Sequence, residues 1–283
     1  MALQSLGALI DSSWEQYRKE FPTLIRLSAW LLVVAAINIV AIGFYPVDAY
    51  RVVRPLTGLE MFGLALFVFN NVVIGIIMVV WTTNMLIAGV DKMTGGAAAN
   101  MKEIANRGWN TFIPQLVAFV YTWVAITISV LIPLLLIKLF TETLAPSLPV
   151  LMSLTILLIL MLLLIPSIAV VFMLAFVPFA VVVDDKRGFD ALKTSWLAVK
   201  ANFWQVFIRL AVPKILYFGI LFLAQYFIIN VVQLVLLGTT DEGSGTYTRL
   251  STYFQAASYL ALVVFVNPLS IITDYHIWKS IKQ

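Results

Sequence analysis

Six long stretches without a charged side chain dominate this chain of 283 residues. The stretches that lack Asp, Glu, Lys and Arg cover 27–47, 61–90, 108–137, 143–183, 215–240 and 250–273. Each is at least as long as the roughly 20 apolar residues that cross a bilayer as a helix. None alternates strictly between apolar and polar residues, as the strands of a membrane barrel do. The sequence therefore predicts an all-α integral membrane protein with six transmembrane helices.

The composition excludes several function classes. With 62% hydrophobic and 11% charged residues, the chain is not an ordinary soluble domain. It has no cysteine and a single histidine, His276, so thiolate and histidine metal clusters are excluded and no metal or cofactor is expected. The net charge of +4 is spread over short segments between the spans, which is typical of a cytoplasmic membrane face. We therefore expect membrane lipids as partners, and no nucleic acid.

The distribution of basic residues predicts the topology. If the N-terminus is cytoplasmic, most of the 18 Lys and Arg residues lie inside, and only Arg51, Arg54, Lys138 and Arg249 lie outside. Charged residues precede the first apolar stretch in the wrong order for a cleavable signal peptide, so this span is expected to remain. We predict a multi-pass protein of the cell (inner) membrane with both termini in the cytoplasm.

The fourth apolar stretch is long enough for two short spans separated at Pro166. Seven spans would, however, export the basic segment from Lys186 to Lys200. We therefore expect one long helix with a kink near Pro166 or Pro178.

An amphipathic segment precedes the first, third and fifth spans. Apolar residues recur there at spacings of three and four, and charged residues fall mostly between them. The clearest stripe is expected to be buried against the bundle or the headgroup layer, with Lys193 and Lys200 toward water. It consists of Phe189, Leu192, Trp196, Val199, Phe203, Val206 and Leu210.

Weak sequence echoes suggest that one membrane domain, 1–283, contains a threefold repeat. Phe21, Phe112 and Phe203 stand 91 residues apart. Each even-numbered span ends on an aspartate, at Asp91, Asp184 and Asp274. We predict three helical hairpins with repeat boundaries at 1–91, 92–184 and 185–283, each opened by a cytoplasmic amphipathic helix. A competing register, with Trp14, Trp109 and Trp204 spaced by 95, and a chance similarity among membrane hairpins stay open as alternatives.

A local motif covers residues 176–207. It contains Phe176-Val177-Pro178, Val183-Asp184-Asp185, Gly188 with Asp190-Ala191-Leu192 and Ser195-Trp196, and Phe203-Trp204 with Phe207. This segment resembles bacterial and archaeal membrane proteins related to the membrane domain of glycerophosphoryl diester phosphodiesterases and to the YciC group. The resemblance implies fold and location, and it carries over no hydrolase activity because no stretch could form the soluble catalytic domain.

The sequence offers little for catalysis. His276 has one acidic neighbour, Asp274, and every carboxylate is expected at a span boundary, with no buried charge pair inside the spans. We therefore predict no enzyme activity. Amide side chains inside the spans include those of Asn38, Asn70, Asn71, Asn84, Gln225, Asn230, Gln233 and Asn267. Asn70, Asn71 and Asn230 are the candidates to line a path, and at least one of the adjacent pair should face another helix.

Two basic residues interrupt the entrance to the fifth span. Arg209 and Lys214 are candidates to hold the phosphate of an anionic phospholipid, although snorkelling to the cytoplasmic interface is the preferred account of both residues. The preferred hypothesis is a non-catalytic scaffold or accessory component that engages lipid or a partner protein, with a homo-oligomer as a further option. The alternative is a permease or lipid-handling transporter with a path between hairpins.

Overall fold

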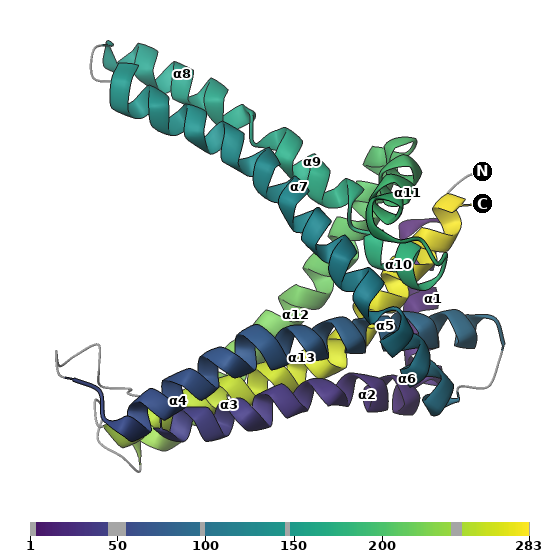
Figure 1. Ribbon diagram of the computed structural model, residues 1–283, viewed down its shortest axis with the longest axis vertical. Coiled ribbons are helices and arrows are strands. Elements are labelled where there is room, and N and C mark those ends of the chain that lie inside the picture. Colours follow the sequence, from purple (N-terminus) through teal and green to yellow (C-terminus); the bar gives the residue numbers. More distant parts are fainter. Residues whose placement is uncertain (1–3, 45–54, 97–99, 145–147, 239–244, 283) are drawn as a thin grey trace. The chain divides into compact units, whose positions relative to one another are not determined.

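The computed structural model describes residues 4–44, 55–96, 100–144, 148–238 and 245–282, and these residues form helices and turns without a strand (Figure 1). Six helical segments are long and apolar enough to cross a membrane. They are Phe21–Phe44, Gly58–Thr94, Phe112–Thr143, Val150–Val182, Phe203–Leu237 and Arg249–Lys282. The predicted all-α fold with six transmembrane helices is confirmed.

Several spans are built from more than one helical element. The elements are α1 (Leu6–Lys19), α2 (Phe21–Ser28), η1 (Ala29–Leu31), α3 (Leu32–Phe44), α4 (Gly58–Phe69), η2 (Asn70–Ile74), α5 (Gly75–Thr94), α6 (Met101–Asn110), α7 (Phe112–Leu139), η3 (Phe140–Leu144), α8 (Val150–Leu162), α9 (Ile165–Met173), α10 (Val177–Val182), α11 (Gly188–Lys200), α12 (Phe203–Leu237) and α13 (Gly245–Lys282). The three predicted amphipathic segments are helical, as α1, α6 and α11, and each precedes an odd-numbered span.

The fourth span is one segment with two breaks. Turns interrupt it after α8 and after α9, and Pro166 and Pro178 lie in the first turns of α9 and α10. Proline fits there because the first N–H groups of a helix have no intrahelical partner. The fourth apolar stretch is one of the six segments long enough to span a membrane, but it consists of three helices joined by turns instead of the one long kinked helix that we expected.

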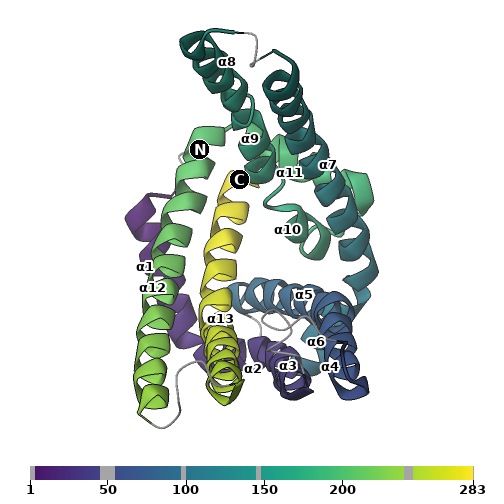
Figure 2. The same ribbon diagram turned by 90° about the vertical axis from the view of Figure 1, so that its left-hand side faces the viewer.

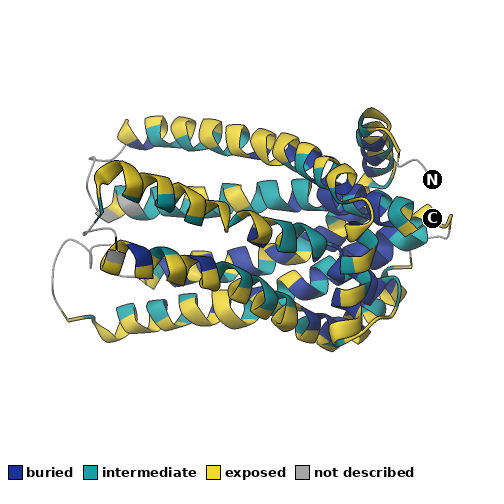
Figure 3. Ribbon diagram, turned by 90° about the horizontal axis from the view of Figure 1, so that it is seen from above, coloured by how far each residue is buried: buried dark blue, intermediate teal, exposed yellow. Residues whose placement is uncertain are grey.

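Most span residues are exposed on the protein surface. In the most apolar 18-residue window of the fourth span only 6% of the residues are buried, against 44% in the first span. Figure 3 shows exposed residues along most of the long helices. Large apolar side chains without protein neighbours are what a lipid environment requires, because lipid tails are as apolar as leucine.

The described residues divide into two compact bodies, which we treat separately. The first body contains 110–208 and 278–282, and the second contains 4–109 and 209–277. In the first body α7, α9, α10 and α11 pack together, and in the second α3 packs along α4 and α2 along α5. Figure 2 shows α12 beside α13, where the Gln225 amide donates to the Gln255 carbonyl at 3.2 Å. The predicted repeat boundaries differ from this division and stay a prediction.

Candidate functional site

Three intramembrane asparagines form a hydrogen-bonded cluster in the second body. The Asn70 amide donates to the Asn38 side-chain oxygen and to the Val34 carbonyl, both at 2.8 Å. Asn71 donates to the same Asn38 oxygen at 3.0 Å and to the Phe67 carbonyl at 2.7 Å. The cluster therefore ties α3 to the second span, as expected for at least one of the two adjacent residues.

The cluster coincides with an irregular turn of the second span. Residues Asn70–Ile74 form a single π-helical turn between α4 and α5. Such turns are uncommon and often mark functional positions. Asn70 is fully buried, and its side-chain oxygen has no hydrogen-bond partner among the described residues.

Asn230 does not take part in this cluster. Its amide donates to the Tyr226 carbonyl at 2.7 Å, four residues earlier in α12, and the residue is exposed. This bond satisfies the amide within its own helix and leaves no link to the other asparagines.

The two basic residues of the predicted lipid-headgroup site both contact protein groups. Arg209 Nε donates to the Gln4 carbonyl at 2.7 Å, and Lys214 Nζ lies 2.9 Å from the Asp274 carboxylate. This pair joins α12 to α13 directly beside the charge-free stretches 215–240 and 250–273, and its side chains are partly buried. Sequence reasoning missed it because the two residues are distant in the chain. The headgroup role of Arg209 and Lys214 stays a prediction.

Two more contacts join Thr273 and Tyr275 of α13 to other helices of the second body. Tyr275 donates to the Asp91 carboxylate at 2.7 Å, and the Tyr217 hydroxyl lies 3.2 Å from that of Thr273. Asp274, adjacent to Tyr275, is engaged by Lys214 and not by His276. Among the described residues no group of three or more His, Asp or Glu side chains could hold a metal ion.

The local motif of residues 176–207 forms a structural corner in the first body. The buried Ser195 hydroxyl donates to the Met173 carbonyl at 2.7 Å and accepts from the Phe176 N–H at 3.2 Å. These are the backbone groups at the break between α9 and α10. Ser195 therefore satisfies polar groups that would otherwise be buried without a partner.

The acidic residues and the glycine of the motif lie in the turn after α10, where the backbone conformation and an ion pair favour these residue types. Asp185 and Gly188 adopt left-handed backbone conformations, with φ of 56° and 49°. Glycine has no steric penalty there, and aspartate tolerates it. The Asp184 carboxylate forms an ion pair with the Lys282 ammonium at 2.6 Å, and this ammonium lies 5.1 Å from the centroid of the Trp278 ring. The motif thus binds the C-terminal residues Trp278 and Lys282 to the turn after α10.

The predicted stripe along α11 is only partly buried. Leu192 and Val199 are buried, but Phe189 is 70% exposed and Trp196 is half-buried. The buried face is centred instead on Ala191 and Ser195, since small side chains allow helices to approach closely. The large aromatic residues are therefore displaced to the edge of the contact.

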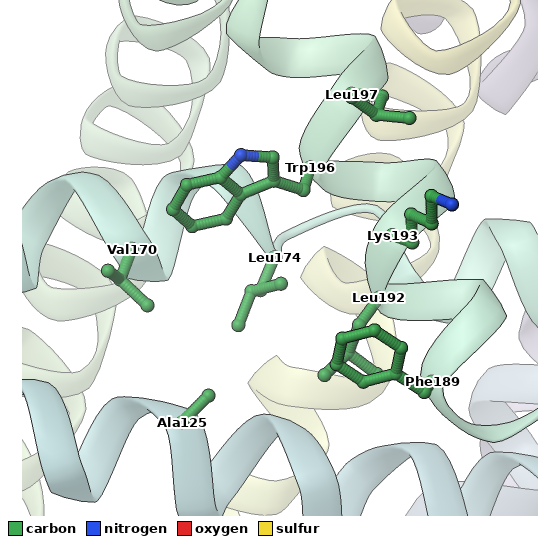
Figure 4. A pocket seen from close by; sticks show the side chains of 8 residues that line it. All are labelled: Ala125, Val170, Leu174, Phe189, Leu192, Lys193, Trp196 and Leu197. Atoms are coloured by element: carbon green, nitrogen blue, oxygen red, sulfur yellow. The ribbon is translucent and has the colours of Figure 1, made fainter.

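An apolar pocket lies beside Phe189 and Trp196, at the edge of the contact between α11 and its neighbours. It has a volume of about 310 Å³, is open on one side, and is lined by residues of α7, of α9 and its C-terminal break, and of α11 (Figure 4). Its lining residues are Ala125, Val170, Leu174, Phe189, Leu192, Lys193, Trp196 and Leu197. No sequence signal singled out Ala125, Val170 or Leu174, because nothing in a uniformly apolar helix marks which residues face a gap.

Comparison with known proteins gives no assignment. No protein-family model matches the chain, and neither the curated proteins nor the solved structures provide a match.

Proposed function

We propose that this chain is a non-catalytic membrane scaffold or accessory component that engages lipid through its amphipathic helices. The observation that carries the proposal is the outer face of α11. Phe189 and Leu197 are 70% and 56% exposed, and Lys193 and Lys200 are exposed on the same side of the helix. Large apolar and basic side chains on one face suit the headgroup layer of a membrane, where each finds its preferred environment.

The burial pattern supports the threefold repeat. At the spacing of 91 residues, Ser13, Ile104 and Ser195 are each fully buried. The same register aligns Tyr17, Gly108 and Val199, which are also buried. Equivalent positions in the three amphipathic helices therefore meet protein. The register of 95 residues aligns Leu9, Ile104 and Val199, which are also buried, so burial supports the repeat without choosing between the two registers.

Contacts of the amphipathic helices also support the repeat. In α1, Tyr17 donates to the Phe265 carbonyl of α13 at 2.9 Å, and burial raises the pKa of this phenol, so it remains a donor. In α6, the Gly108 carbonyl accepts from Asn84 of α5 at 3.4 Å, and in α11 Ser195 bonds to the α9–α10 break.

Each amphipathic helix thus contacts the even-numbered span of another predicted repeat. The first contacts the third, the second contacts the first and the third contacts the second.

The inner-membrane location with cytoplasmic termini rests on the distribution of basic residues. It predicts that a cysteine at Thr141 reacts with an impermeant thiol reagent applied outside intact cells. A cysteine at Thr94 should not react until the membrane is opened. The reverse pattern would contradict the orientation.

A permease is the second candidate, and one observation favours it. The Lys214–Asp274 pair belongs to the fifth and sixth long helical segments, directly beside their charge-free stretches, with side chains 35% and 13% exposed. Partly buried charges in membrane helices often mark transport paths. We rank the permease second because the pair and the asparagine cluster both join helices, as structural contacts also do.

Native mass spectrometry of the purified full-length chain tests the lipid proposal. We expect the chain to retain anionic phospholipid, chemically unchanged, through graded detergent washing. Replacing both Phe189 and Leu197 by serine should reduce retention severalfold. Unchanged retention in this variant would contradict the role of α11.

A second variant, Arg209→Gln/Lys214→Gln, tests the predicted headgroup site. If it retains as much phosphatidylglycerol or cardiolipin as the unaltered chain, these two residues do not bind the headgroup and only snorkel to the interface.

A further inference from the structure

The pocket of the first body has the character of a hydrocarbon site. Its walls are formed by Ala125 of α7, by Val170 and Leu174 at the end of α9, and by apolar side chains of α11. A volume of about 310 Å³ lies at the lower end of the range of roughly 300–1,000 Å³ for small-molecule pockets. This space suits a segment of one acyl chain better than a whole phospholipid.

Lys193 and Trp196 are the two lining residues with a polar atom, and both lie at the edge of the pocket. In Figure 4 Leu174 points into the space, Trp196 covers one side, and the Lys193 nitrogen is directed away from the apolar side chains. The Lys193 stem therefore lines the pocket while its ammonium reaches outward. Among the described residues Lys193 forms no ion pair, so its charge is available to a ligand. Tryptophan beside a basic residue is typical of the membrane interface.

We infer that this pocket binds one acyl chain of an anionic phospholipid, whose phosphate is attracted by Lys193. Charge complementarity selects the headgroup, and the apolar walls select the chain. The inference rests on the proposed lipid engagement and adds to it a specific position and lipid class. Without an occupant the pocket would leave apolar side chains unpacked beside the span, which costs dispersion energy.

Photocrosslinking of the full-length chain tests the assignment. The chain is reconstituted in phosphatidylcholine vesicles that contain a trace of diazirine-tailed phosphatidylglycerol or, separately, diazirine-tailed phosphatidylcholine with the same chains. We expect label on Leu174, Leu192 or Trp196, with the anionic probe preferred. Lys193→Gln should lower that preference about fivefold, which corresponds to roughly 1 kcal/mol for one basic side chain near an anionic headgroup.

Matched variants separate the pocket from the general lipid surface. Lys200→Gln changes an exposed lysine of the same helix that does not line the pocket, so the preference should be unchanged. Ala125→Trp should fill the pocket and abolish its label, whereas Val124→Trp, on the exposed side of α7, should not. Because Ala125→Trp alters a helix contact, the folding of this variant is checked by its melting temperature. If the variant is unfolded, the comparison of Lys193→Gln with Lys200→Gln decides the outcome.

Two results would overturn the inference. Equal pocket labelling by both probes would show an apolar crevice filled by any lipid, and label spread evenly over the spans would show no site. Lipid retention is measured on the same samples, so that a failure of the pocket assignment can be distinguished from a failure of the proposed function. If retention persists without pocket labelling, only the pocket assignment is wrong.

Discussion

The Lys214 ammonium lies 2.9 Å from the Asp274 carboxylate, and the pair links α12 to α13 within the second body. The Asp274 side chain is 13% exposed, so its charge depends on this partner more than on solvent. Removing one member of such a pair leaves the other uncompensated in a poorly solvated place.

Breaking this pair should destabilise the folded chain. We expect Lys214→Met or Asp274→Asn to cost about 1–3 kcal/mol, below the value for a fully buried pair because Lys214 is partly exposed. The measurement is reversible unfolding in detergent micelles. Lys138→Gln is the control, since Lys138 and Glu142 are 3.9 Å apart and largely exposed, and it should cost less than about 0.5 kcal/mol. Equal effects of the two lysine variants would contradict a stabilising role for the pair.

Ser195→Ala should weaken the corner of the first body. It removes both bonds at the α9–α10 break and leaves the Phe176 N–H buried without a partner, which costs about 1–3 kcal/mol. Limited proteolysis near residues 174–176 should become faster. Thr194→Ala is the control, because the Thr194 hydroxyl only donates to Asp190 in its own helix. A Ser195 variant as resistant as the Thr194 variant would refute this role.

The asparagines inside the spans should differ in their contribution to stability. Asn70→Leu breaks two bonds to α3 and should cost about 1–2 kcal/mol. Asn230→Leu loses a bond within its own helix and should be nearly neutral. Unfolding curves of the two variants under identical detergent conditions check the difference. A stabilised Asn70→Leu variant would instead point to a strained, functional cluster.

The spans and amphipathic helices were predictable because their signal is local. Charge-free length and the spacing of apolar residues depend on neighbouring residues alone, so six spans and the positions of α1, α6 and α11 follow from the sequence. The breaks at Pro166 and Pro178 follow from the missing proline N–H.

The contacts between helices could not be predicted in the same way. The pairing of Lys214 with Asp274 depends on how distant segments pack. The exposure of Phe189 depends on which face of α11 approaches its neighbours. Small residues such as Ala191 decide that face, although their spacing gives only a weak apolar signal. The pocket depends on the same packing and was not visible in the sequence.

The depth of α11 in the membrane tests the central claim most directly. Because the chain has no cysteine, a single Leu197→Cys residue can carry a unique spin label. In vesicles that contain phosphatidylglycerol, the label should be relaxed more strongly by oxygen, which concentrates in lipid, than by a water-soluble nickel complex. A label at the exposed turn residue Lys186 should show the opposite order. If Leu197 is as accessible to nickel as Lys186, the outer face of α11 lies in water and the proposed lipid engagement is wrong.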